Sequence, residues 1–571
     1  MSIRSLVLLA MVTLSVAACN SGNGNVQPSA NVPDTKAPVV VSVVPPDGDT
    51  LATPTDPIVV HFNEAIADTA ENRNAVLVQG PSGPLPGNGM VRGDVLSVQP
   101  QPPLAYNTPY VATLQAGVTD LAGNATTADY TWKFRTFENL CPSETLTGLT
   151  LIEGKQRPLN LPAIPKPPKG ASYIDPLYGT CVTRVTDHYK EPPVGFARND
   201  YSRREPFNAD GSLMLIYAQD GYWHLYDART YQWIRKLNLG GGSVEPQWHP
   251  TDPDLLYVIP NHGGLTMSTV NVENGARRTV ADFRDVASIA GHPGVTDLTR
   301  IWPNAARVWT RSEGSPSRDA RYWAFQVETS DFQPIGMISY DLKTNAITGI
   351  YDFDSDGGGI GRPDHVSISP LGDYVVASWN GPGVNCSSES ALGSLHHPCG
   401  LMSFSRDFSS AVGLAVRGPH SDMALTADGH EVIVISDYDR GSVVMLRLDT
   451  GALTTLWNIY INGAATAMHF SGKNYAVPGW ILISTYGLKD PQGALPWYSN
   501  KIMAVELKAN PRILNIANIV NSADHYFSEP QAAVNGSFTR ILFNSNWGTG
   551  KDTDVDAYMI TLPGGAIPAS P

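Results

Sequence analysis

The sequence carries little charge, and most of that charge is negative. Charged residues make up only 16% of its 571 residues, and 53 Asp and Glu against 39 Lys and Arg give a formal net charge of −14 at pH 7. Lys and Arg form no long cluster. Because binding to phosphates requires a basic patch that releases counterions, the sequence argues against nucleic acid as a partner.

Long apolar runs are also scarce, and the clearest one stands at the N-terminus. Leu6–Val16 follows Arg4, and small residues lead from it to Cys19. The run is too short to cross a bilayer as a stable helix, so residues 1–19 are expected to be a signal peptide. Residues 20–37 are small, polar and Pro-bearing, which predicts a flexible tether.

The end of the apolar run, Val16-Ala-Ala-Cys19, resembles the lipobox of bacterial lipoproteins. The resemblance implies that Cys19 is acylated and anchors the chain to a membrane of the cell envelope. The residue after Cys19 is Asn20 and not Asp. By resemblance to enterobacterial lipoprotein sorting, this favours the outer membrane, with the protein facing either the periplasm or the surface. An ordinary signal peptide cleaved near Ala18 is the alternative.

Cysteine is rare, with five residues in the whole chain. Without Cys19, an even set remains, which suits disulfides in an oxidising compartment. Pairing of sequence neighbours, Cys141 with Cys181 and Cys386 with Cys399, is the simplest of the three possible connectivities. A metal site made of these cysteines is disfavoured, because no CxxC spacing occurs.

Gly and Pro are plentiful, with 52 and 45 residues spread along the chain, which favours short strands joined by tight turns. Residues 38–137 show alternating strands of this kind, which predicts a β-sandwich. Val44-Pro-Pro-Asp-Gly48, Val60-His-Phe-Asn-Glu-Ala65 and Gly117–Asn124 resemble the bacterial Ig-like domain of surface-layer proteins. That resemblance implies a spacer or an adhesion module, and residues 138–170 are expected to connect it to the next domain.

Residues 171–571 contain a loose repeat of a strand, a turn similar to Ser-Pro-Asp-Gly and a second apolar strand. The second strands are expected at 213–217, 255–258, 322–325, 374–377, 432–435, 480–483 and 541–543. A period of 40 to 60 residues with several strands per unit indicates a β-propeller, so the fold class is all-β. Seven blades are expected, with six or eight as alternatives. Residues 180–186 are expected to close the ring beside residues 557–561, pinned there by a Cys141–Cys181 bridge.

Polar residues precede the repeated turns, where the inner strands of a propeller line its channel. They are Arg203, Arg204, Glu205, Glu245, Asp364, His365, His420, Asp422, His469, His525, Tyr526 and Glu529. Two interpretations remain open. Each residue hydrogen-bonds within its own blade, or the side chains converge and bind a divalent metal or supply acid–base groups.

The propeller region also resembles periplasmic propellers of the TolB type and oligogalacturonate lyases, through His525–Pro530 followed by Ile541–Gly548. This resemblance implies that His420, His469 and His525 serve as metal ligands or base. It also implies that Arg203 or Arg204 neutralises a uronate carboxylate. The compact His-x-His pattern expected near the last blade is missing, and Glu529-Pro530 stands there instead.

Asp352, Asp354 and Asp356, followed by Gly357, resemble the start of a calcium-binding loop. A plain Asp-Gly turn explains the same residues equally well. A cofactor, if there is one, is therefore expected to be Ca²⁺ or one divalent transition metal.

Two functions follow from these patterns. The first is a monomeric, membrane-anchored protein whose propeller mouth binds a glycan or a protein partner, with the Ig-like domain as a stalk. The second is a polysaccharide lyase or related carbohydrate-active enzyme that uses the His- and Arg-lined channel. A lyase requires His and Arg within hydrogen-bond reach of one point, whereas a binding surface requires only exposed polar or aromatic groups.

Overall fold

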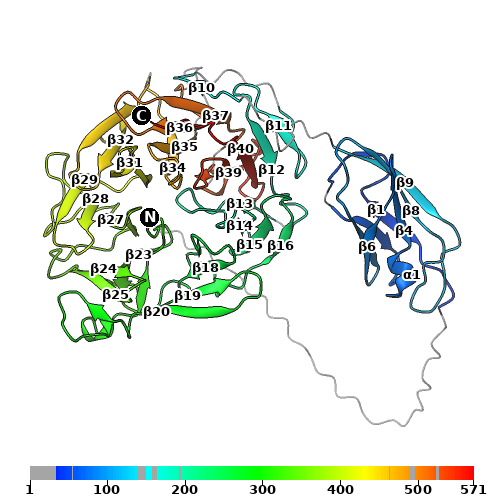
Figure 1. Cartoon of the computed structure of the whole chain (residues 1–571), viewed down its shortest axis with the longest axis horizontal. Coiled ribbons are helices and arrows are strands. Elements are labelled where there is room, and N and C mark those ends of the chain that lie inside the picture. Colours follow the sequence, from blue (N-terminus) through cyan, green and yellow to red (C-terminus); the bar gives the residue numbers. More distant parts are fainter. Residues whose placement is uncertain are drawn as a thin grey trace, which may run out of the picture.

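The structure is a computed structural model and describes residues 34–54, 56–137, 149–156, 164–191, 195–461, 463–487, 496–522 and 526–570. Cys19 and the expected signal peptide and tether up to residue 33 lie outside the described residues. Nearly all regular structure is β-strand, in a small sandwich and a larger ring (Figure 1). Three short helical turns are described: α1 (Ala70–Arg73), η1 (Leu298–Arg300) and η2 (Tyr526–Ser528). In the described part of the chain, no helix has the length and apolar character needed to cross a membrane.

The sandwich consists of two sheets with orders β1-β3-β7-β6 and β2-β9-β8-β4-β5. Its strands are β1 (Val40–Val44), β2 (Asp49–Ala52), β3 (Ile58–Phe62), β4 (Val76–Gly80), β5 (Gly83–Leu85), β6 (Gly87–Arg92), β7 (Val95–Pro100), β8 (Pro109–Leu114) and β9 (Tyr130–Thr136). Buried and exposed residues alternate along β3 and β9, as in strands with one face toward a core. Asp120 closes the turn before β9, because its Oδ1 accepts hydrogen bonds from the backbone of Ala122 and Asn124.

Among the described residues, the ring contains seven groups of four antiparallel strands, and we assign one blade to each group. Blade 1 is β13 (Ala197–Arg198), β14 (Leu213–Ala218), β15 (Trp223–Asp227) and β16 (Trp233–Lys236). Blade 2 is β17 (Gln247–Trp248), β18 (Leu255–Val258), β19 (Thr266–Asn271) and β20 (Arg277–Asp282). Blade 3 is β22 (Arg307–Trp309), β23 (Tyr322–Glu328), β24 (Pro334–Asp341) and β25 (Ala346–Asp352), with β21 (Ser288–Ile289) beside β25. In Figure 1, β16 and β20 lie at the rim of the ring.

The remaining blades complete the circle. Blade 4 is β26 (His365–Ile368), β27 (Tyr374–Ser378), β28 (Leu401–Ser405) and β29 (Ala411–Ala415). Blade 5 is β30 (Ser421–Leu425), β31 (Glu431–Asp437), β32 (Ser442–Arg447) and β33 (Leu453–Asn458). Blade 6 is β34 (Ala467–Ser471), β35 (Trp480–Tyr486), β36 (Lys501–Glu506) and β37 (Ile513–Asn518), with β10 (Ile152–Glu153) beside β37. Blade 7 is β38 (Ala533–Val534), β39 (Arg540–Ser545), β40 (Asp556–Thr561) and β12 (Cys181–Arg184), with β11 (Ser172–Ile174) at its edge.

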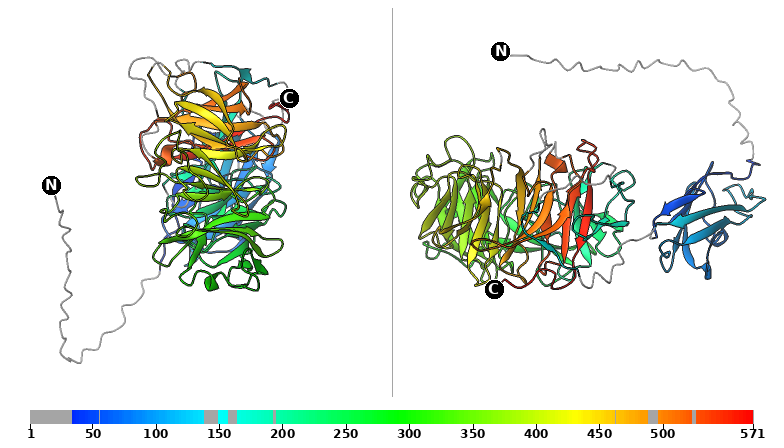
Figure 2. Two further views of the ribbon diagram at one scale, coloured as in Figure 1. Left: turned by 90° about the vertical axis from the view of Figure 1, so that its left-hand side faces the viewer. Right: turned by 90° about the horizontal axis from the view of Figure 1, so that it is seen from above.

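The ring is closed by a strand that precedes blade 1 in the sequence. β12 pairs antiparallel with β40, from Cys181 opposite Thr561 to Arg184 opposite Tyr558. This confirms the prediction that residues 180–186 close the ring beside residues 557–561. The first and last segments of the propeller therefore share one blade, with β12 beside β40 in Figure 1 and the red strands beside the teal ones in the right-hand view of Figure 2.

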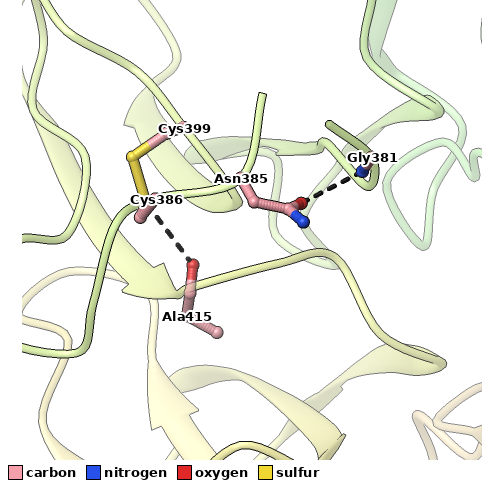
Figure 3. Close-up of a disulfide and its surroundings, with 5 residues drawn as sticks. All are labelled: Gly381, Asn385, Cys386, Cys399 and Ala415. Atoms are coloured by element: carbon pink, nitrogen blue, oxygen red, sulfur yellow. Dashed lines mark hydrogen bonds between the residues drawn. A yellow bond between two sulfur atoms is a disulfide. The ribbon is translucent and has the colours of Figure 1, made fainter. Parts of the chain in front are cut away.

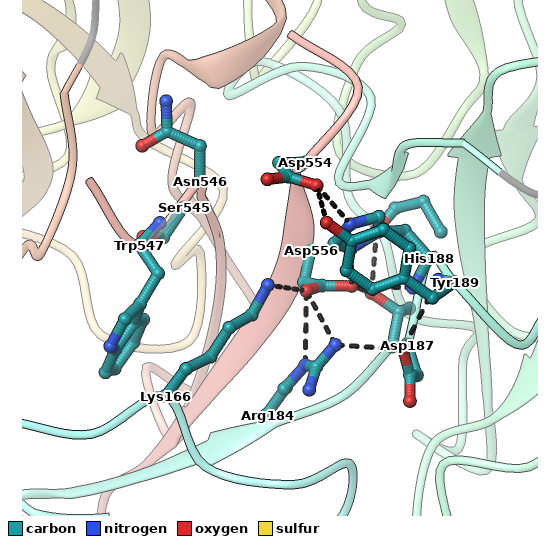
Figure 4. Close-up of polar contacts among 12 residues, drawn as sticks. Lys166, Arg184, Asp187, His188, Tyr189, Ser545, Asn546, Trp547, Asp554 and Asp556 are labelled. Atoms are coloured by element: carbon teal, nitrogen blue, oxygen red, sulfur yellow. Dashed lines mark hydrogen bonds and ion pairs between the residues drawn. The ribbon is translucent and has the colours of Figure 1, made fainter. Parts of the chain in front are cut away.

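A buried charge network holds the closing strands together (Figure 4). The Asp556 carboxylate has no exposed surface and lies 2.9 Å from Arg184 Nη2, 2.6 Å from Lys166 Nζ and 2.9 Å from His188 Nδ1. Asp554 continues the network and contacts His188 Nε2 at 2.8 Å. Burial alone would raise the pKa of Asp556, but the His188 hydrogen bond and the Arg184 and Lys166 charges hold it below its usual value.

Cys386 and Cys399 form a disulfide, as predicted, with a Cα–Cα distance of 5.0 Å (Figure 3). The bridge clips the long connection between β27 and β28, where Asn385 Oδ1 also accepts a hydrogen bond from Gly381 N at 3.1 Å. Cys181 is disulfide-bonded as well, and its predicted partner Cys141 lies outside the described residues.

Replacing Asp556 with Asn is expected to destabilise the closed ring. The substitution keeps the size of the side chain but leaves the buried Arg184 and the partly exposed Lys166 without their shared counter-charge. Removing one partner of a buried ion pair costs about 3–5 kcal/mol. Urea unfolding followed by tryptophan fluorescence measures the loss, with Asp373→Asn at an exposed pair as control. Equal stability of the two variants would contradict a closure role for Asp556.

Candidate functional site

Ionisable side chains gather at the end of the channel where the inner strands of the blades begin. We call Arg203, Glu313, His365, His420, His469 and Glu529 the mouth cluster. Arg203 joins four blades: its Nη1 donates to Glu313 Oε2 at 2.8 Å and to His365 Nε2 at 2.9 Å. Its Nε donates to the Ser421 carbonyl oxygen at 2.5 Å. The guanidinium of blade 1 is thus bound by blades 3, 4 and 5.

These contacts determine the tautomer of His365. An arginine nitrogen can only donate, so His365 Nε2 is the acceptor and Nδ1 carries the ring proton. That Nδ1 faces the Asp364 carboxylate at 3.5 Å and Glu313 at 3.8 Å. Burial and the charge of Arg203 lower the pKa of His365, which keeps the ring neutral near pH 7.

His420 and His469 form a stacked pair beside Arg203. Their ring centroids lie 4.5 Å apart at an interplanar angle of 25°, and Tyr486 stacks on the other face of His469 at 5.0 Å. His469 Nε2 lies 2.8 Å from Glu529 Oε2. His420 Nδ1 lies 3.1 Å from the Met468 carbonyl oxygen, which can only accept, so the His420 lone pair is on Nε2.

The electrostatics of the cluster favour neutral imidazoles next to a permanent cation. Burial, with help from His469 and Arg203, lowers the pKa of His420 to about 4. Burial and the charges of Arg203 and Arg198 lower the pKa of His469 to about 3. Burial raises the pKa of the Glu529 carboxyl. The cluster therefore presents guanidinium donors and imidazole lone pairs near pH 7.

An aromatic group borders the mouth cluster. The Arg198 guanidinium is surrounded by the rings of Phe196, Tyr217, Tyr526 and Phe527, at 5.5, 5.6, 5.9 and 5.1 Å from their centroids. Its Nη1 donates to Gln531 Oε1 at 2.7 Å and to two backbone carbonyl oxygens. Tyr526 is 52% exposed, so one face of this group is open to solvent.

Several residues predicted for the channel serve as links between blades. Arg204 donates to Asp200 Oδ2 at 2.5 Å and to the Ser312 carbonyl oxygen at 2.9 Å. Glu245 accepts hydrogen bonds from the backbone of Thr310 and Ser312. Asp422 pairs with Lys473 at 3.1 Å, and none of these three side chains contacts the mouth cluster through a hydrogen bond among the described residues. His525 lies outside the described residues.

Glu205 lies apart from the mouth cluster. It lines a cavity of 540 Å³ with Phe207, Trp248 and Lys473, among others. The inner strands pass from the mouth, at Arg203 and His469, toward this cavity, at Glu205 and Lys473. The cavity therefore opens at the opposite end of the channel.

Sequence patterns missed three members of the site: Glu313, Arg198 and Tyr486. Glu313 follows Arg311 and Ser312, which have left-handed backbone with φ of 60° and 71°, in a connection that does not match the repeated turn. Arg198 and Tyr486 lie at the ends of strands that read only as core. The sequence does hold one indication for Arg198, because a charged residue in an inner strand is rarely buried without a partner.

Two groups of potential metal ligands converge within the described part of the chain. In Glu313, Asp364 and His365, one ligand atom from each lies within 4.8 Å of the others, and the same holds for Asp34, Glu64 and Asp120 of the sandwich. In the first group, Arg203 already binds Glu313 and His365 Nε2. The guanidinium thus supplies the positive charge that a metal ion would bring.

The predicted calcium loop has no convergent ligands among the described groups. Asp352 Oδ1 accepts hydrogen bonds from the backbone of Asp354 and Ser355, and its Oδ2 accepts from Trp302 Nε1. Asp356 Oδ2 accepts from the backbone of Asp352. These contacts are those of an Asp-Gly turn, so the turn interpretation accounts for the three residues.

Residues 34–136 match the family of bacterial Ig-like domains, which confirms the predicted Ig-like domain. No curated protein matches the chain. Among solved structures, an oligogalacturonate lyase in complex with manganese is 16% identical with a TM-score of 0.46, over 69% of this chain and 96% of that one. An oligogalacturonate lyase from Vibrio parahaemolyticus is 12% identical with a TM-score of 0.44, over the same shares. Kuenenia stuttgartiensis hydrazine synthase is 13% identical with a TM-score of 0.36, over 64% of this chain and 97% of that one. Likenesses this distant carry no argument about activity.

The neutral histidines predict a pH dependence of stability. Their folded-state pKa values lie below the ordinary value of 6.5, so the unfolded chain binds more protons as the pH falls. The stabilisation is complete above about pH 6.5 and decreases as the pH falls toward 4. Replacing His420 with Gln is expected to flatten this slope, measured as the urea midpoint between pH 7 and pH 4.5. His430→Gln, at an exposed turn, is the control, and an unchanged slope in His420→Gln would contradict the assignment.

Proposed function

We propose that the chain is a bacterial envelope lipoprotein, anchored through Cys19, whose propeller binds an acidic glycan at the mouth cluster. The observation that carries the proposal is Tyr526, an exposed ring that covers the Arg198 guanidinium beside the mouth cluster. An aromatic face packs against a sugar ring, and a guanidinium binds carboxylates through paired hydrogen bonds. A uronate residue carries both groups, a sugar ring for the aromatic face and a carboxylate for the guanidinium.

Electrostatics support an anionic ligand at this end. Arg198 is buried, and its hydrogen bonds go to neutral oxygens, so no described carboxylate is hydrogen-bonded to this cation. Burial lowers the pKa of Arg198, because the charged guanidinium is removed from water there. A ligand carboxylate near Tyr526 would restore part of this solvation. Neutral His420 adds an acceptor for a sugar hydroxyl group.

The Ig-like domain fits the role of a spacer. It has its own buried core, including Val60, Leu96, Ala112 and Trp132. With a lipid on Cys19 and a polar tether over residues 20–37, it would hold the propeller away from the membrane surface.

The anchor has a direct test. Replacing Cys19 with Ala removes the only sulfur that the lipobox pattern would acylate, and stable anchoring depends on the lipid chains. We expect the wild-type chain in the outer-membrane fraction of an expressing bacterium and the variant in the soluble fraction. Cys386→Ala is the matched control for loss of one cysteine, and it should remain in the membrane fraction. A membrane-bound Cys19→Ala variant would rule out the anchor.

The glycan site predicts a graded effect at Tyr526. Isothermal titration with oligogalacturonate and its methyl ester should show binding of the acid form alone. Tyr526→Ala should weaken it at least tenfold, equivalent to about 1.4 kcal/mol, while Tyr526→Phe keeps the ring and most of the affinity. Tyr130→Ala, an exposed ring of the sandwich, is the control. Binding to neutral glycans alone, or to a protein surface instead, would overturn the proposal.

A uronate lyase is the second candidate, favoured by the neutral His420 imidazole close to Arg203. A base works best with a pKa near the operating pH, and a pKa of about 4 makes His420 a weak base. The glycan titrations distinguish the two functions, because a lyase generates unsaturated products that absorb in the ultraviolet. An absorbance increase that His420→Gln abolishes would make the mouth cluster an active site.

A further inference from the structure

The cavity at the opposite end of the channel is built from several blades. Its volume of 540 Å³ falls in the range of small-molecule sites, about 300–1,000 Å³. Blade 1 contributes Glu205 and Phe207, blade 2 contributes Trp248, blade 6 contributes Tyr475 and the last blade contributes Asn535. Aromatic, amide and charged side chains thus line the cavity together with the Glu205 carboxyl group.

The Glu205 carboxyl has hydrogen-bond donors but no counter-charge. Its Oε1 accepts from the Phe207 backbone at 3.3 Å, and the backbone of Gly536 is its other donor. Among the described residues, no Lys, Arg or His nitrogen forms an ion pair with it. Burial raises the pKa of Glu205 to about 8, against the smaller opposing effects of these donors and of Lys473.

The nearest cation is already neutralised. Lys473 Nζ lies 3.1 Å from Asp422 Oδ1, and the Lys473 and Asp422 side chains are 7% and 2% exposed. The other ionisable groups that line the cavity are Asp210, His249, Arg318, Tyr475 and Arg540. Hydrogen bonds from Ser212 lower the pKa of Asp210, and burial lowers that of His249 and raises that of Tyr475. Glu205 is therefore the cavity group expected to change protonation between pH 7 and pH 8.

We propose that this cavity is a second binding site, separate from the mouth cluster, for a small ligand with a primary ammonium group that pairs with Glu205. An ammonium group supplies the missing counter-charge and hydrogen-bond donors that the Glu205 carboxylate can accept. The Phe207, Trp248 and Tyr475 rings provide apolar surface for the rest of the ligand. An amino sugar and the amino end of a short peptide share this chemistry.

Binding has a proton signature. At pH 7 Glu205 is mostly protonated, and an ammonium ion would drive it to the carboxylate. The complex therefore releases close to one proton into the buffer. Isothermal titration of the purified full chain with benzylamine, in two buffers of different ionisation enthalpy, measures that proton. Benzyl alcohol is the neutral analogue and is expected not to bind.

Glu205→Gln provides the matched variant, since it keeps shape and hydrogen bonding and removes the charge. We expect at least tenfold weaker benzylamine binding, no proton release and an unchanged urea midpoint. Tyr526→Ala, at the other end of the channel, should bind benzylamine as the wild type does. Glucosamine and phenylalaninamide, each against its N-acetyl form, distinguish a sugar amine from a peptide amine.

Three results would overturn the proposal: no amine binding, equal binding of benzyl alcohol, or benzylamine binding that survives in Glu205→Gln. If Glu205→Gln fails to fold, the proton release measured with the wild-type chain still tests the proposal. Benzylamine binding without proton release would exclude Glu205 as the partner of the ammonium group. Acidic glycans bind at the mouth, so failure here leaves that site unaffected.

Discussion

Pairing of β12 with β40 is the contact on which the rest of the propeller depends. Without it, the outer edge of the last blade is free. Asp556 strengthens the contact by binding cations from the segment before blade 1. The mouth cluster depends on the same closure, since Arg203 follows the first inner strand and Glu529 precedes the last.

Strand positions could be predicted from sequence because they follow from local rules. A turn residue and an apolar strand recur together in each blade, and each of the seven expected second strands coincides with a strand between β14 and β39. Closure by residues 180–186 was predictable too, since a ring needs a strand for its last edge. The Cys386–Cys399 bridge followed from the short separation of the two cysteines.

Contacts across the channel could not be predicted in this way. Histidine recurs at the starts of inner strands, yet nothing in the repeat says that His420 stacks on His469 while His365 accepts from Arg203. Those contacts depend on how far each side chain reaches across the axis. Glu313 lies in a connection with left-handed backbone, outside the repeated pattern. Glu205 follows Arg203 by only two residues in the sequence, yet it lines the cavity at the other end of the channel.

Charge balance explains why the two ends differ. At the mouth, Arg198 is buried, and no described carboxylate is hydrogen-bonded to it. In the far cavity, the Glu205 carboxyl forms no ion pair among the described residues, although Lys473, Arg318 and Arg540 line the same cavity. Lys473 lines the far cavity, but it is paired with Asp422, so Glu205 has no ion pair with it. The two proposed ligands therefore differ in charge, an anion at the mouth and an ammonium ion in the far cavity. A single continuous ligand of one sign cannot satisfy both requirements, which favours two chemically distinct ligands over one threaded chain.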